Sequence, residues 1–114
     1  MLKHITIRPA TGTWVIRAGG AVLGESTRAL ELSEGDLPSV IYFPREDVAM
    51  AFLEPSSYRT TCQYKGEASY FDIMSKSMTY KSAVWTYEAP HPEVAEIAGY
   101  LAFYVQDGVT VEQV

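Results

Sequence analysis

The chain has a single cysteine and only two histidines, and this scarcity limits its disulfide and metal chemistry. Cys62 has no second cysteine with which to form an internal disulfide, so we expect a protein of the reducing cytoplasm. One cysteine and the widely separated His4 and His91 do not supply a closed tetrahedral zinc site. The sequence therefore predicts no bound metal, and it leaves any cofactor unknown.

Long apolar runs and clusters of basic residues are also missing. No segment approaches the roughly 20 apolar residues of a membrane-spanning helix, and residues 1–10 lack the apolar run of a signal peptide, so we expect a soluble, unsecreted protein. The net charge is −5 and the basic residues are scattered, so the footprint of nucleic-acid or membrane-surface binding is absent. We expect neither nucleic acid nor a membrane as a partner, and the oligomeric state stays open.

Short alternating runs of apolar and polar residues are the main pattern that is present. A chain of 114 residues, 47% of them hydrophobic, is of the size of one globular domain spanning 1–114. In 4–8, Ile5 and Ile7 share one face, as in a strand with one buried side. The pair Gly19-Gly20 lies between two β-favouring segments and predicts a tight hairpin turn. We therefore predict a mainly β domain of short antiparallel strands.

Helical signals are few. Proline at position 92 and glycine at position 99 punctuate one short helical segment near 93–98. Residues 44–48 suit a short helical turn, because proline is tolerated at its first position and acidic residues follow. The polar stretch 33–38 reads as a loop.

Aromatic residues are concentrated in one part of the chain: all of them except Trp14 lie between Tyr42 and Tyr104. One interpretation is a β core with tyrosines at its margin. The other is a cleft formed by segments 45–47 and 59–70, with aromatic walls and a few polar groups that orient a small molecule. In that cleft, Arg45 and Lys65 would hold an anion or a carbonyl group. Aromatic walls would come from Tyr64, Tyr70 and Trp85, and hydrogen bonds would be accepted by Glu46 or Glu67.

Cys62 is the candidate catalytic residue. Lys65 or Arg59 beside it would favour the reactive thiolate. A cysteine nucleophile also needs a histidine base, and neither histidine is close to it in the sequence. The alternative is that Cys62 is a small buried apolar residue.

Five ordered blocks of sequence carry a family pattern: YFPREDV (42–48), LEPS (53–56), CQYKGEASY (62–70), AVW (83–85) and IAGYLAFY (97–104). Over about 4–111 the chain resembles the small, mostly bacterial domain-of-unknown-function family 427, catalogued in places as nucleotidyltransferase-like. The family commonly reads Cys-Pro-Tyr-Lys-Gly, and Gln63 replaces that proline here.

The resemblance implies a compact, mostly β fold similar to the β-tent, in which two sheets meet at an angle. Some β-tent proteins bind zinc through cysteine pairs, which this chain lacks. The nucleotidyltransferase-like label implies phosphate chemistry, for which the sequence shows neither a glycine-rich loop nor a spaced pair of carboxylates for magnesium.

Three functions stay open from the sequence: binding of a small polar or aromatic ligand in a cleft, an enzyme that uses Cys62 or a carboxylate, and a protein-interaction module. A deep pocket with an exposed Cys62 and a carboxylate of shifted pKa favours catalysis. A pocket with a buried Cys62 favours binding. A flat apolar patch without a pocket favours a protein interface.

Overall fold

The computed structural model describes residues 4–114. Within them are ten strands and three short 3-10 helices, in the order β1 Ile5–Pro9, β2 Trp14–Ala18, β3 Ala21–Ser26, β4 Leu30–Glu34, β5 Val40–Tyr42, η1 Arg45–Asp47, η2 Met50–Phe52, β6 Leu53–Cys62, β7 Gly66–Met74, β8 Thr79–Thr86, η3 Pro92–Ile97, β9 Leu101–Phe103 and β10 Val109–Gln113. No helix of this described part is long and apolar enough to cross a membrane.

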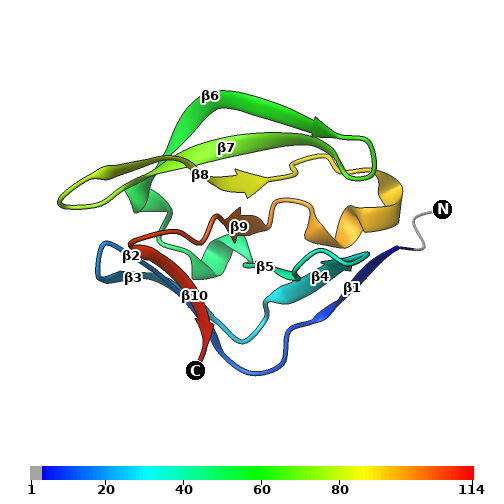
Figure 1. Ribbon diagram of the computed structural model, residues 1–114, viewed down its shortest axis with the longest axis horizontal. Coiled ribbons are helices and arrows are strands. Elements are labelled where there is room, and N and C mark those ends of the chain that lie inside the picture. The colour runs from blue at the N-terminus through cyan, green and yellow to red at the C-terminus, as the bar shows by residue number, and fades with distance from the viewer. Residues whose placement is uncertain (1–3) are drawn as a thin grey trace.

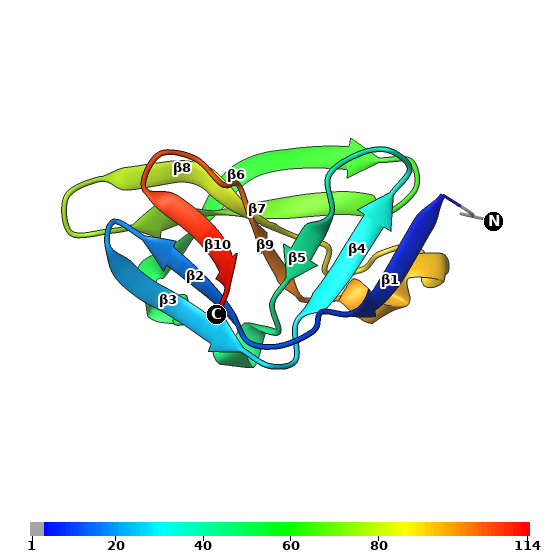
Figure 2. The same cartoon turned by 60° about the horizontal axis from the view of Figure 1, so that its bottom comes forward.

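The strands form three antiparallel sheets, with the orders β1-β4-β5, β10-β2-β3 and β6-β7-β8-β9. The four-stranded sheet is the upper layer in Figure 1, and the two smaller sheets lie beneath it. Figure 2 shows those two sheets side by side, with β10 and β5 at their facing edges. The prediction of a mainly β fold built from short antiparallel strands is confirmed.

The predicted hairpin joins β2 to β3. Gly19 and Gly20 have φ angles of 59° and 84°, a conformation that a two-residue turn between twisted strands requires and that glycine adopts readily. Val15 and Ile16 are buried on β2, so the turn fixes which apolar residues of the hairpin reach the interior.

The predicted helical segment near 93–98 is confirmed as η3, although it is made of 3-10 turns. Val94, with φ −123° and ψ 29°, interrupts the helical backbone, and Gly99 follows with a φ of 75°. The helical turn predicted at 44–48 is η1, which begins directly after Pro44. The expected loop at 33–38 begins later, because residues 33 and 34 pair with β1 as the end of β4.

The buried residues form two clusters of different composition. The first contains mainly aliphatic residues and phenylalanine, with Tyr80 as its one tyrosine. The second lies between the β1-β4-β5 sheet and the four-stranded sheet, and it contains Tyr42, Tyr70 and Tyr87. Phenolic side chains bring hydroxyl groups into the interior, and buried hydroxyls need partners. The second cluster therefore has the buried polar groups that a ligand-binding site requires.

Candidate functional site

A pocket of about 370 Å³ opens beside the second cluster, and we call it the tyrosine pocket. It is lined chiefly by aromatic and charged side chains from both layers: Glu34, Tyr42, Thr60, Lys65, Tyr70, Trp85, Tyr87 and Tyr104. Three of the predicted ligand-binding residues, Lys65, Tyr70 and Trp85, are thus brought together.

Strand pairing positions the aromatic walls. On β7, buried and exposed positions alternate from Gly66 to Tyr70, so that Tyr70 faces the interior. Tyr70 pairs across the sheet with Trp85 of β8. Tyr42 comes from β5 in the layer below, and its hydroxyl accepts a hydrogen bond of 3.2 Å from the indole Nε1 of Trp85. This bond links the two layers inside the pocket.

Lys65 is the buried cation of the pocket. Only 8% of the residue is exposed, and its Nζ donates a hydrogen bond of 2.7 Å to the Glu34 Oε1. An ammonium group removed from water needs an opposite charge or hydrogen-bond partners, so this ion pair is what makes the burial tolerable. The ammonium has three N–H donors, and Glu34 takes one of them.

The turn between β6 and β7 sets the position of this lysine. Gly66 has a φ of 115°, in the region that side chains with a Cβ atom rarely adopt. The carbonyl oxygen of Lys65 accepts a backbone hydrogen bond of 3.0 Å from His91, just before η3. The turn is therefore tied to the segment that follows β8.

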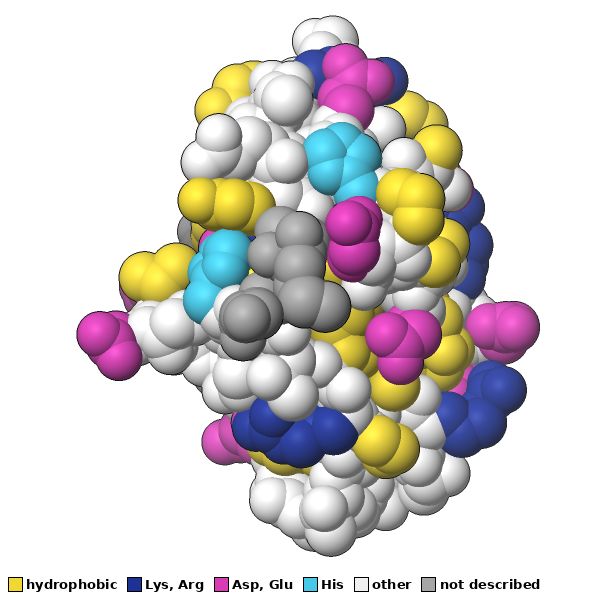
Figure 3. Space-filling view, turned by 90° about the vertical axis from the view of Figure 1, so that its right-hand side faces the viewer, with side chains coloured by type: hydrophobic (Ala, Val, Ile, Leu, Met, Phe, Trp, Pro, Cys, Tyr) yellow, Lys and Arg dark blue, Asp and Glu magenta, His cyan; other side chains and the backbone are white. Residues whose placement is uncertain are grey.

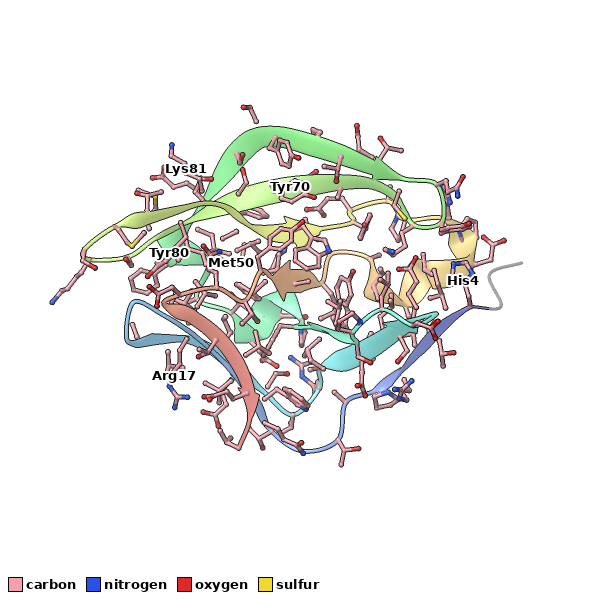
Figure 4. The ribbon with its side chains drawn as sticks, in the orientation of Figure 1. His4, Arg17, Met50, Tyr70, Tyr80 and Lys81 are labelled. Carbon is pink, nitrogen blue, oxygen red and sulfur yellow. The ribbon has the colours of Figure 1, made fainter. Side chains whose placement is uncertain are left out.

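His4 and Tyr64 lie at the same end of the molecule. The His4 Nε2 is 3.8 Å from the Glu34 Oε2, and its ring meets the Tyr64 ring edge-on, with centroids 4.5 Å apart. Figure 4 labels His4 at the start of β1, far from Lys81 on the four-stranded sheet. Figure 3 views this end and shows both histidines of the chain on one face. Tyr64 thus packs against His4 rather than forming a wall of the pocket.

The rim of the pocket is aromatic. Tyr104, 47% exposed, lies against Trp85 with ring centroids 4.5 Å apart and ring planes tilted by 45°. Tyr58, 53% exposed, lies against Tyr70 with centroids 4.8 Å apart. The Tyr70 hydroxyl is 2.8 Å from the Thr60 hydroxyl. A ligand entering the pocket would therefore pass flat, partly exposed rings.

Burial keeps three of the hydroxyl groups protonated well above neutral pH. Burial raises the pKa of Tyr42 and of Tyr87 far above the ordinary value of 10.0. Burial, together with the Tyr70 hydroxyl, raises the pKa of Tyr104 to about 12. A protonated phenol is a hydrogen-bond donor. Since the Tyr42 oxygen already accepts from Trp85, its proton is available to another acceptor.

Arg45 and Glu46 line a different surface, which we call the arginine depression. It is an open hollow of about 710 Å³ whose lining includes Arg28, Arg45, Glu46, Glu88 and Tyr100. The Arg45 Nη2 donates a 2.8 Å hydrogen bond to Glu88, and the guanidinium lies 5.7 Å from the centre of the Phe71 ring.

A second arginine of the same depression is also paired. Arg28 donates a 3.1 Å hydrogen bond to Asp47, and the Ser26 hydroxyl donates one of 2.7 Å. The hydrogen bond from Ser26, followed by that from Arg28, lowers the pKa of Asp47. Both arginines thus already have a carboxylate partner.

The expectation of one cleft made from segments 45–47 and 59–70 is wrong in its geometry. The pocket-lining part of 59–70 adjoins Glu34, whereas Arg45 and Glu46 line the other depression. The reason is the length of β6, whose ten residues separate η1 and η2 from the turn that carries Lys65 (Figure 1). Glu67 is exposed on β7, in the alternate register to its buried neighbours. The ligand-binding assignments of individual residues remain predictions.

Sequence reasoning missed Glu34, Tyr42, Tyr87 and Tyr104. One signal was present for Glu34: Leu30, Leu32 and Glu34 follow at intervals of two, which places the carboxylate on the apolar face of a strand. The interpretation of 33–38 as a loop placed Glu34 outside the strand. The tyrosines gave no local signal, because strand pairing brings them to one place.

Cys62 is half-buried at the end of β6, opposite Gly66, and packs against the second cluster. It is not among the residues that line the tyrosine pocket. Within residues 4–114, no three His, Cys, Asp or Glu side chains are grouped as metal ligands would be. The catalytic role of Cys62 and the absence of a metal both remain predictions.

Comparison with known sequences agrees with the family pattern of the five blocks. No curated protein matches the chain. Residues 6–114 match a family described as a domain of unknown function, DUF427, whose short name, NTP_transf_9, carries the nucleotidyltransferase label. This match extends over nearly the whole described chain, and the protein therefore belongs to the DUF427 family.

Proposed function

We propose that the tyrosine pocket binds a small, flat molecule that carries a carboxylate or carbonyl group. The observation that carries this proposal is the burial of Lys65 inside an aromatic pocket, with its Nζ 2.7 Å from Glu34. A buried ion pair is weak evidence for stability, because an apolar pair of similar size is often as stable. Its presence in a concave, ring-lined site therefore favours a role in recognition.

The polar groups favour an acceptor on the ligand. Lys65 has two N–H donors beyond the one used by Glu34, and Tyr42 and Tyr87 are protonated phenols. The charge of Lys65 is balanced by Glu34, so a neutral carbonyl as well as a carboxylate would find donors there. An ammonium ligand such as benzylamine carries no acceptor for these N–H and O–H donors and would be disfavoured.

The walls favour a flat body. Trp85 and Tyr104 present contacting rings, tilted by 45°, at the opening, and Tyr70 and Tyr87 continue the aromatic lining inward. Aromatic rings bind other flat surfaces by offset or edge-on packing, with a gain beyond the apolar area buried. Aromatic carboxylates and amides are therefore the simplest molecules that match the pocket.

Binding without chemical conversion is the function best supported. Cys62 does not line the pocket and packs instead against the second cluster. A pocket with a buried Cys62 was the arrangement expected of a binding protein, and the half-buried Cys62 meets it only in part. We also propose the cytoplasm as its location, in keeping with a single free cysteine.

Titration with benzoate, benzamide and benzylamine, followed by the indole N–H signal of Trp85 in nitrogen-15 NMR spectra, tests the proposal. We expect benzoate and benzamide to shift this signal at millimolar concentration and benzylamine to leave it unchanged. Equal responses to all three, or none to benzoate, would contradict the proposal.

Variants then locate the site. Lys65→Met should weaken benzoate binding at least tenfold, whereas Lys81→Met, on the exposed face of β8, should leave it unchanged. Since loss of Lys65 leaves Glu34 without its partner, Tyr87→Phe serves as a second variant that removes only a hydroxyl. It should weaken benzoate binding by about three- to tenfold, in line with one neutral hydrogen bond.

A further inference from the structure

A third, smaller hollow of about 250 Å³ lies next to the tyrosine pocket, and we call it the apolar extension. Its lining includes Trp14, Val40, Trp85, Phe103, Val105 and Val111. These side chains come from β2, β5, β8, the end of β9, the segment after β9, and β10, so the extension lies where the three sheets approach one another (Figure 2).

The extension and the tyrosine pocket share two residues of their lining. Val40 and Trp85 belong to both. On β5, Tyr42 belongs to the second cluster and Ile41 packs against the first, so the two faces of this strand contact different clusters. Val40 is the first residue of β5, and the bridge from this segment to β9 lies beyond the other end of the strand, between Phe43 and Leu101. The two hollows therefore adjoin around the beginning of this strand.

The chemistry of the two hollows differs. The extension offers mainly aliphatic and aromatic surface, and Val105 at its margin is 66% exposed. Its one carboxylate, Glu31, is 3.4 Å from the Arg8 guanidinium and so already has a basic partner. Apolar surface that water covers in the free protein gains free energy when an apolar group replaces the water.

We propose that the apolar extension is a subsite for the tail of the ligand whose head occupies the tyrosine pocket. This inference rests on the proposed function and narrows it. The ligand class becomes a flat carboxylate or carbonyl compound with an unbranched apolar tail. The head lies near Lys65, the flat body passes Trp85, and the tail continues toward Trp14 and Val111.

A series of para-alkylbenzoates tests the subsite: benzoate, 4-ethylbenzoate and 4-butylbenzoate. The chain has two tryptophans, and their indole N–H signals report on different hollows, because Trp85 lines both and Trp14 lines the extension alone. We expect benzoate to shift the Trp85 signal only, and 4-butylbenzoate to shift both. Affinity should rise roughly fourfold for each methylene that the extension covers.

The outcomes separate the two proposals. If benzoate binds but the alkyl series gains no affinity and Trp14 does not respond, the subsite is refuted and the head-binding pocket stands. If benzoate itself fails to bind, the proposed function fails, and the inference fails with it.

A charged variant at the margin of the apolar extension tests whether the ligand tail binds there. Val105→Asp should abolish the gain with tail length while leaving benzoate affinity unchanged. The matched control is Val22→Asp, a change at another exposed valine, on β3, which lines neither hollow. If the gain persists equally in both variants, the tail binds elsewhere and the inference is overturned.

Discussion

The tyrosine pocket and the arginine depression both contain an ion pair, yet the two pairs differ in how far they are exposed to water. In the pocket, the side chains of Lys65 and Glu34 are 10% and 19% exposed. In the depression, those of Arg45 and Glu88 are 38% and 52% exposed. Water screens the second pair and is largely excluded from the first. Distance alone, 2.7 Å against 2.8 Å, would not separate them.

The largest effect should follow from breaking the buried pair on one side. Glu34→Leu leaves the Lys65 ammonium without its partner, and we expect a loss of roughly 3 kcal/mol in the free energy of unfolding. The double variant Glu34→Leu with Lys65→Met should recover most of this loss, because no uncompensated charge remains. Denaturant unfolding of the three proteins measures both values, and a double variant no more stable than Glu34→Leu would contradict the prediction.

The next effect is a loss of stability at alkaline pH, which arises from two buried tyrosines of the tyrosine pocket. Because burial raises the pKa values of Tyr42 and Tyr87 above 10.0, the folded state keeps both protons where the unfolded state loses them. Stability should therefore be unaffected below pH 10 and fall above it, on the order of 1 kcal/mol per tyrosine at pH 11.

Ultraviolet titration of the folded protein checks this expectation, since fewer than the eight tyrosines of the chain should ionise by pH 11. Tyr87→Phe should reduce the loss of stability between pH 10 and pH 11. Ionisation of all eight in the native state at pH 10 would count against the burial argument.

A smaller effect is expected for the exposed pair of the arginine depression. Glu88→Ala removes the carboxylate beside Arg45, and the free energy of unfolding should fall by less than about 1 kcal/mol. The difference should shrink further in 1 M salt, which screens exposed charges. Chemical denaturation with urea at low and high salt measures it. A loss as large as that of Glu34→Leu would remove the contrast between the regions.

The smallest effect concerns Asp47 at acidic pH. Its pKa is below the ordinary value of 3.8, so its stabilising contribution is present above about pH 4 and is lost as the pH falls through the folded pKa. The difference in melting temperature between the wild type and Asp47→Asn should be constant above pH 5 and narrow below pH 4. Ser26→Ala removes the hydroxyl donor and should move the pH at which this difference narrows to a higher value. A difference that does not vary with pH would contradict it.

Local signals in the sequence predicted much of the fold. The glycine pair at 19 and 20, the alternation around Ile5 and the punctuation of 92–99 each concern neighbouring residues, and each corresponds to an observed element. Such features depend on backbone conformation within a few residues, which the residue types largely determine.

The candidate site was predicted less well, because its parts come from distant segments. Lys65 and Glu34 are 31 residues apart, and Trp85 and Tyr42 are 43 apart. Whether two such residues meet depends on which strands pair and on how one sheet lies over another. Clustering along the sequence grouped Arg45 with Lys65, whereas the length of β6 places them in different hollows.

The turn that carries Lys65 has a consequence for the kinetics of binding. Gly66 and the backbone bond from His91 fix the main chain at Lys65, and Glu34 holds its ammonium, before any ligand arrives. Little conformational entropy would then be lost on association, and a small molecule should enter with no slow closing step. Differences in affinity between ligands would accordingly arise in their dissociation rates, so that residence time, rather than speed of capture, would distinguish a preferred ligand from a poor one.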